Sequence, residues 1–300
     1  MNHIQKIKGY TSILLSAAIY GFMPLVAKFL YAEGVNPLSL IFLRNALALP
    51  VLAILALATD RTLKVSPKAL PSISGIALVG YCLTPLLLFP SYQYIDSGTA
   101  TVFHFIYPSV VLVAAFIKNR RIDRQSLLCV LLCALGVGLF YTPGKPLDWR
   151  GAALALLSGV AYAVYILLLS AFKHKVPAFT LSFYISLVCS VVMLIVCLAT
   201  GQLALPTSLG GWLLALLFAL MLNVGAAVLF QQGTLIIGGQ LASILSTAEP
   251  IVSMIVGVLA FREALTAQTA IGAVLVVAAS ILIVALDIRK ADKQTASDPS

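Results

Sequence analysis

Residues 98–111 read GTATVFHFIYPSVV, and residues 240–253 read QLASILSTAEPIVS. When the two stretches are aligned, Pro108 matches Pro250 at a displacement of 142 positions. The same displacement relates other uncommon residues: Tyr20 with Tyr162, and Arg120 with Arg262. Matched Leu or Ala would mean little in so apolar a chain, but matched Pro, Tyr and Arg indicate an internal repeat.

The composition predicts a membrane protein. Hydrophobic residues make up 61% of the 300 residues, charged residues only 10%, and the mean hydropathy is +1.05, whereas soluble domains carry about 25% charged residues. A bilayer needs about 20 apolar residues per helix, and ten segments of that size are present: 10–30, 37–58, 70–92, 97–117, 124–141, 151–172, 178–199, 210–231, 240–261 and 266–286. The expected fold is therefore an all-α membrane protein with ten transmembrane helices.

The repeat divides these helices into two halves of five, 1–143 and 148–288, before a polar tail at 289–300 that we expect to be disordered and cytoplasmic. Since five is odd, the second half enters the membrane in the opposite orientation. Inverted repeats around a central cavity are a recurrent design of secondary transporters, because two interchangeable halves can alternate access to one site.

Basic residues fix the expected orientation. With the N-terminus inside, the inner segments hold most of the 19 Lys and Arg: Lys6, Lys8, Arg61, Lys64, Lys68, Lys118, Arg120, Arg121, Arg124, Lys173, Lys175, Arg289, Lys290 and Lys293. The outer segments hold only Lys145, Arg150 and Arg262. Positive charge collects on the cytoplasmic side of membrane proteins, so both termini are expected in the cytoplasm, and the net charge of +9 does not indicate nucleic-acid binding.

Several stretches resemble EamA-type proteins of the drug/metabolite transporter superfamily. YGFMPLVAKFL (20–30) and NPLSLIFLRNALA (36–48) are similar to the family's first two helices, with matches at Gly21, Lys28, Pro37 and Arg44. The stretch 248–284 is similar to its closing pair of helices, with matches at Glu249, Pro250, Glu263, Leu265 and Gly272. Tyr20 replaces the family's usual Trp, and Arg121 stands where the second half has Glu263. The resemblance implies an inner-membrane carrier whose fifth and tenth helices pack outside. Family members move amino acids, nucleotide sugars, quaternary amines or drugs.

Ionisable residues inside spans are candidates for function. Glu249 lies about nine residues into its helix, near the expected midplane, where it could bind a substrate cation, carry a proton or hold a structural bond. Arg44 could bind a substrate carboxylate, although pairing with Glu249 or with backbone carbonyls is favoured. Lys28, near the outer end of its helix, is expected to extend to the interface.

Two further candidates follow from the repeat. His104 corresponds to Ser246, and Tyr107 corresponds to Glu249, so the halves differ at the same depth. Tyr20 and Tyr162 are expected to add aromatic surface nearby, with Phe103 and Tyr165 beside them. An acid among aromatic faces suits a cationic or zwitterionic amine, although aromatic residues in spans are more often plain packing.

Prolines inside spans remove backbone donors and bend helices. We expect Pro108 and Pro250 to bend the fourth and ninth helices around the cavity, with Pro24 as a further bend in the first helix. Such breaks are tolerated where neighbours or a water-filled cavity satisfy the freed carbonyls.

The sequence predicts a secondary transporter of a small organic metabolite, such as an amino acid, amine or drug-like solute, in the cytoplasmic membrane, with export favoured over uptake. A coupling proton is left open as a second partner. The alternative is a channel or a structural or assembly membrane protein. No catalytic motif, cofactor or metal site is expected, because HExxH, GxSxG and GxxxxGK[ST] are missing, and the five cysteines, Cys82, Cys129, Cys133, Cys189 and Cys197, suit packing.

Overall fold

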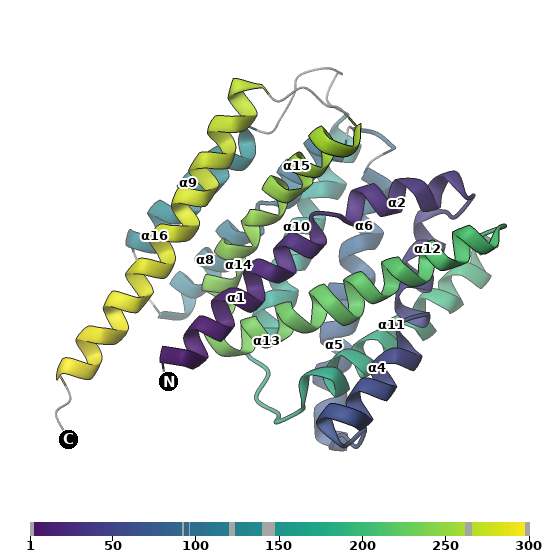
Figure 1. The fold of residues 1–300 in the computed structure, drawn as a ribbon, viewed down its shortest axis with the longest axis horizontal. Coiled ribbons are helices and arrows are strands. Elements are labelled where there is room, and N and C mark those ends of the chain that lie inside the picture. Colours follow the sequence, from purple (N-terminus) through teal and green to yellow (C-terminus); the bar gives the residue numbers. More distant parts are fainter. Residues whose placement is uncertain are drawn as a thin grey trace.

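The computed structural model describes residues 3–91, 93–95, 97–119, 124–139, 148–261 and 266–297, and within these ranges every regular element is a helix (Figure 1). Seven segments of the described chain are long and apolar enough to cross a membrane: Ile4–Ala32, Pro37–Asp60, Pro67–Ser91, Ala100–Lys118, Trp149–Ser170, Ala178–Ala199 and Leu209–Ile237. Two shorter apolar helices lie at Arg124–Gly138 and Ala270–Leu286. The chain is therefore an all-helical, multi-pass membrane protein.

Several of these segments consist of more than one helix. The first half contains α1 (His3–Tyr20), α2 (Met23–Ala32), α3 (Pro37–Ala46), α4 (Leu49–Leu55), η1 (Ala56–Asp60), η2 (Pro67–Ala69), α5 (Leu70–Ile76), η3 (Ala77–Leu83), α6 (Thr84–Ser91), α7 (Ser97–His104), α8 (Tyr107–Asn119) and α9 (Arg124–Gly138). The second contains α10 (Trp149–Ser170), α11 (Ala178–Ala199), α12 (Leu209–Ala219), η4 (Leu220–Ala226), α13 (Ala227–Ile237), α14 (Gly239–Leu245), η5 (Ser246–Ala248), α15 (Glu249–Phe261) and α16 (Ala267–Ser297).

The expected span 240–261 is one of the interrupted segments, since it is divided among α14, η5 and α15. The expected tail also differs, because α16 continues as helix to Ser297. Its last residues include Lys, Gln and Ala, which favour helix, and extending an existing helix requires no new nucleus. Arg120, Arg121, Arg262, Glu263, Leu265 and Lys145 lie outside the described residues.

The three prolines singled out in the sequence each occupy the second position of a helix that follows a break. Pro24 follows the turn at 21–22, Pro108 follows the turn at 105–106, and Pro250 follows η5. At the start of a helix the missing N–H of proline costs no intrahelical bond. The breaks before Pro108 and Pro250 fall at matching places in the two halves.

Helices of one half pack mainly against helices of the other. The principal pairs are α1 with α13, α6 with α10, α3 and α4 with α11, α8 with α14, and α9 with α16. Figure 1 shows α9 and α16 together at one edge of the molecule. Their backbones approach closely, since a Cβ built on Gly272 would lie 2.5 Å from the carbonyl oxygen of Gly136. Small residues allow such contacts between membrane helices.

Candidate functional site

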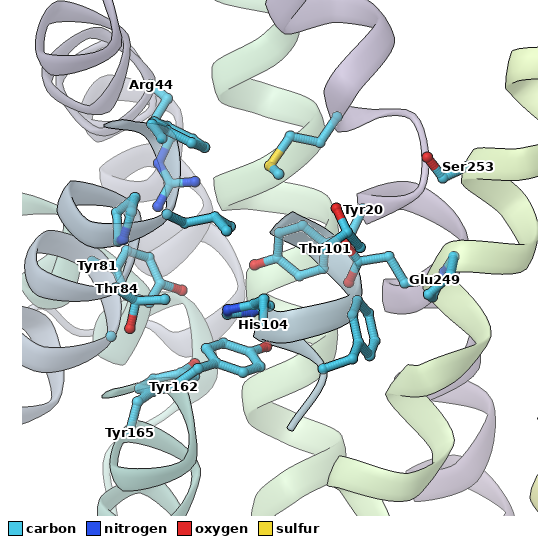
Figure 2. A pocket seen from close by; sticks show the side chains of 17 residues that line it. Tyr20, Arg44, Tyr81, Thr84, Thr101, His104, Tyr162, Tyr165, Glu249 and Ser253 are labelled. Carbon is cyan, nitrogen blue, oxygen red and sulfur yellow. The ribbon is translucent and has the colours of Figure 1, made fainter. Parts of the chain in front are cut away.

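A cavity of about 100 Å³ lies among helices of both halves (Figure 2). This is enough space for several water molecules or a small solute. Side chains from α1, α2, α3, η3, α6, α7, α10 and α15 line it: Tyr20, Met23, Arg44, Gly80, Tyr81, Thr84, Pro85, Leu88, Phe89, Thr101, His104, Phe105, Tyr162, Tyr165, Glu249, Pro250 and Ser253. The cavity is thus assembled from segments far apart in the sequence.

Most of the candidates proposed from the sequence meet at this cavity. Tyr20, Arg44, His104, Tyr162, Glu249 and Pro250 are among the lining residues. Tyr107 and Pro108 are buried behind the lining. The side chain of Pro24 lies outside the described residues, and Lys28 is exposed elsewhere on α2. Sequence reasoning missed the lining residues Tyr81, Thr84, Thr101 and Ser253.

The cavity carries a basic and an acidic side chain on separate walls. Arg44, from α3, is only 8% exposed, and its Nε has no hydrogen-bond partner among the described residues. Glu249, the first residue of α15, is half-buried and makes no hydrogen bond or ion pair with another described residue. Figure 2 shows the two side chains on opposite sides of the cavity. The ion pair considered from the sequence is therefore not formed in this structure.

Arg44 lies over the ring of Tyr81, whose centroid is 5.8 Å from the guanidinium carbon. The hydroxyl of Tyr81 accepts a hydrogen bond of 2.9 Å from Gln231, and Gln231 accepts one of 2.8 Å from Ser182. Gln231 and Ser182 are fully buried members of α13 and α11. Hydrogen-bonded side chains of the second half thus hold the Tyr81 ring next to Arg44 of the first half.

Aromatic rings form a continuous wall at the cavity. Tyr162 is at its centre, with ring centroids 5.4 Å from His104, 4.9 Å from Tyr107, 5.4 Å from Tyr165 and 5.9 Å from Phe230. Ring faces attract cations by their quadrupole. The wall therefore suits an organic cation as well as an apolar group.

Two hydrogen bonds hold the side chains of the interrupted helices. His104 Nδ1 is 2.8 Å from Ser158 Oγ, and Tyr107 Oη is 2.8 Å from Ser246 Oγ. Gly159 brings α10 close to the end of α7, since a Cβ there would lie 2.4 Å from the carbonyl oxygen of His104. The glycine allows Ser158 to reach the imidazole.

Metal-ligating groups do not gather in the described part of the chain: no cluster of three or more His, Cys, Asp or Glu side chains is found there. All five cysteines are buried. The sulfurs of Cys82, in η3, and Cys189, in α11, are 3.3 Å apart, so this pair joins the two halves.

Comparison with known proteins gives the family. The model of the EamA-like transporter family matches twice, at residues 7–142 and 149–285. An uncharacterized transporter of Archaeoglobus fulgidus is 27% identical over 280 residues, covering 91% of this chain and 95% of that protein. The uncharacterized inner membrane transporter YicL of Salmonella typhimurium is 25% identical over 301 residues, covering 94% and 97%.

The uncharacterized transporter YcbK of Bacillus subtilis is 25% identical over 283 residues, covering 88% of each chain. A solved crystal structure superposes with a TM-score of 0.75 at 20% identity, covering 94% of this chain and 98% of that one, which shows a shared fold. Since the family model covers both halves of the sequence, the chain with this charged, aromatic cavity belongs to the EamA-like transporter family.

Proposed function

We propose that this chain is a secondary transporter that moves a small zwitterionic amine across the cytoplasmic membrane by alternating access. The observation that carries the proposal is the cavity between the halves, with a basic and an acidic side chain on separate walls, neither paired with another described residue. A buried charge without a partner is costly. A ligand with a carboxylate for Arg44 and an ammonium for Glu249 would supply both partners at once.

The proposed topology has ten crossings in two inverted halves of five. The seven longer segments account for seven of these crossings, and α9, α14 together with α15, and α16 account for the others. The helix pairings support this, because exchanging the two halves converts the α1–α13 pair into the α10–α6 pair and leaves the α3–α11 and α9–α16 pairs unchanged. The distribution of basic residues supports a topology with both termini in the cytoplasm.

The test is counterflow in proteoliposomes that contain the purified full-length chain. Vesicles are loaded in turn with amino acids, simple amines and monocarboxylates, and uptake of the labelled solute from outside is followed. We expect saturable counterflow of at least one amino acid, no counterflow of monocarboxylates, and a rate that falls in Arg44→Met. Equal transport of amines and strictly anionic solutes would exclude the proposed selectivity.

The same vesicles test the runner-up function. A channel would pass solute without saturation and without acceleration by solute on the opposite side, and a structural protein would pass none. Imposing a pH gradient separates proton-coupled transport from exchange, since only a coupled carrier concentrates solute in response to it. Reversing the solute gradient measures whether export is faster than uptake.

A further inference from the structure

The hydrogen bonds around Ser158 fix which nitrogen of neutral His104 carries the proton. Ser158 Oγ donates to the carbonyl oxygen of Ala155 at 2.6 Å, and a hydroxyl has only one proton to donate. At the 2.8 Å contact with His104, Ser158 must therefore accept, and Nδ1 must donate. Neutral His104 is consequently protonated on Nδ1 and keeps a lone pair on Nε2.

That lone pair is available to a ligand. His104 lines the cavity (Figure 2), and Nε2 makes no hydrogen bond with another described residue. The charged and titratable groups around it are Tyr20 of α1, Tyr107 of α8, Tyr162 of α10 and Glu249 of α15, with Arg44 of α3 on the far wall. The imidazole therefore offers an acceptor to a ligand in the cavity that Glu249 also lines.

The repeat relates this acceptor to Glu249. Tyr107 corresponds to Glu249 and Ser246 corresponds to His104, both at a displacement of 142. Since Ser246 Oγ donates to the carbonyl oxygen of Ser243 at 3.1 Å, Tyr107 donates to Ser246, and these two residues satisfy each other in the protein. In the related pair both members, the carboxylate and Nε2, are acceptors, and neither has a protein donor.

We propose that His104 and Glu249 form an acceptor pair that binds the N–H groups of a primary ammonium and discriminates against quaternary ammonium compounds. The inference rests on the proposed function and deepens it. The rings of Tyr20 and Tyr162 attract any organic cation, so they cannot distinguish the two classes. Directed acceptors can, because a trimethylammonium group has no N–H to donate. Arg44 repels the cation and so directs it to this end of the cavity.

Equilibrium binding to the purified full-length chain in nanodiscs tests the selectivity. The probes are the standard amino acids other than proline, each paired with its N,N,N-trimethyl betaine, which keeps the carboxylate and side chain. Measurements are made at pH 8, where an imidazole of ordinary pKa, about 6.5, is neutral. We expect at least one amino acid to bind about tenfold or more tightly than its betaine, as loss of hydrogen bonds to a charged group predicts.

Variants locate the source of that selectivity. His104→Phe removes the acceptor and should bring the two affinities to within about threefold, and His104→Gln, whose amide oxygen can accept, should retain part of the ratio. Ser158→Ala leaves the imidazole in place but no longer fixes which nitrogen carries the proton, so it should lower the ratio of amino-acid affinity to betaine affinity. This variant tests the proposal even if His104→Phe fails to fold. His174→Gln changes an exposed histidine outside the cavity and should leave the ratio unchanged.

The proposal is overturned if no probe binds, if betaines bind as tightly as their amino acids, or if Ser158→Ala and every folded His104 variant keep the wild-type ratio. These results are distinct from failure of the proposed function. Selectivity is read from equilibrium binding, whereas the carrier mechanism is read from counterflow, so either can fail while the other holds.

Discussion

Replacing Glu249 by Gln separates a binding role of this residue from a structural one. The change removes a negative charge and leaves the size of the side chain almost unaltered. Because the carboxylate makes no hydrogen bond or ion pair with another described residue, the substitution strands no donor in the protein. A purely binding role therefore predicts loss of ligand affinity without loss of stability.

The magnitudes follow from the position of the residue. Glu249 is the first residue of α15, where a negative charge stabilises the helix by about 0.3–1 kcal/mol. A partly buried carboxylate without a partner costs more than a neutral amide of the same size, because burial penalises a charge more than a neutral polar group. This effect opposes the loss at the helix start and is the larger of the two, so we expect the free energy of unfolding of the ligand-free variant to rise by about 1 kcal/mol. A hydrogen bond to a charged group contributes about 1.5–3 kcal/mol, so amino-acid affinity should fall about 10- to 100-fold.

Unfolding in sodium dodecyl sulfate, followed by tyrosine fluorescence, measures the first quantity, and ligand titration in nanodiscs measures the second. Glu33→Gln is the matched control, since Glu33 Oε2 accepts a 2.7 Å hydrogen bond from Ser208 away from the cavity. That control should lose a little stability and keep its affinity. If Glu249→Gln unfolds more easily than the wild type yet binds amino acids equally well, Glu249 is structural and our reasoning is wrong.

Three further changes test the packing between the halves. Gly272→Ala places a Cβ 2.5 Å from the Gly136 carbonyl oxygen and should destabilise the protein by about 1–3 kcal/mol in detergent unfolding. Gly138→Ala, with no atom of the other described residues within 4 Å, should not, and equal stabilities of the two variants would contradict the close α9–α16 contact. Asn223 Nδ2 donates to Asn45 Oδ1 at 2.7 Å, so a double-mutant cycle with Ala at both positions should give a coupling of about 0.6–1.7 kcal/mol, and zero coupling would argue against this bond. Copper phenanthroline should oxidise Cys82 and Cys189, 3.3 Å apart, to a disulfide that links the tryptic peptides of η3 and α11; Cys82→Ser is the control, and persistence of both thiols would contradict the placement.

Hydropathy predicts where the long helices lie, because apolar length is a property of local sequence. All seven spanning segments overlap expected spans. The π-helical segments η3 and η4 were not predicted, since the spans 70–92 and 210–231 were read as uninterrupted helices. Gly80 of η3 lies against the ring of Tyr165, where a Cβ would be 2.3 Å from Cδ2. A contact between residues so far apart leaves no local pattern.

The charged members of the cavity were predictable because an ionisable residue in a span is rare and costly. Tyr81, Thr84 and Thr101 were missed because neutral polar side chains in apolar helices are compatible with ordinary packing. A signal for Tyr81 was present in the repeat, since its counterpart is Asn223, a second buried polar residue inside a π-helical segment. The lack of an Arg44–Glu249 ion pair depends on the separation of two walls, which only the three-dimensional structure contains.

The differences between the halves explain how one cavity could both hold and release a zwitterion. Tyr20 and Tyr162 are equivalent and alike, whereas Arg44 corresponds to Ser186 and Glu249 to Tyr107. Arg44 and His104 both belong to the first half, and Glu249 belongs to the second. Under the proposed rocking of one half against the other, the carboxylate site therefore stays with one half, whereas the ammonium site is divided between the two. Movement of the halves would change the distance between His104 and Glu249, so ammonium binding would strengthen and weaken during the transport cycle.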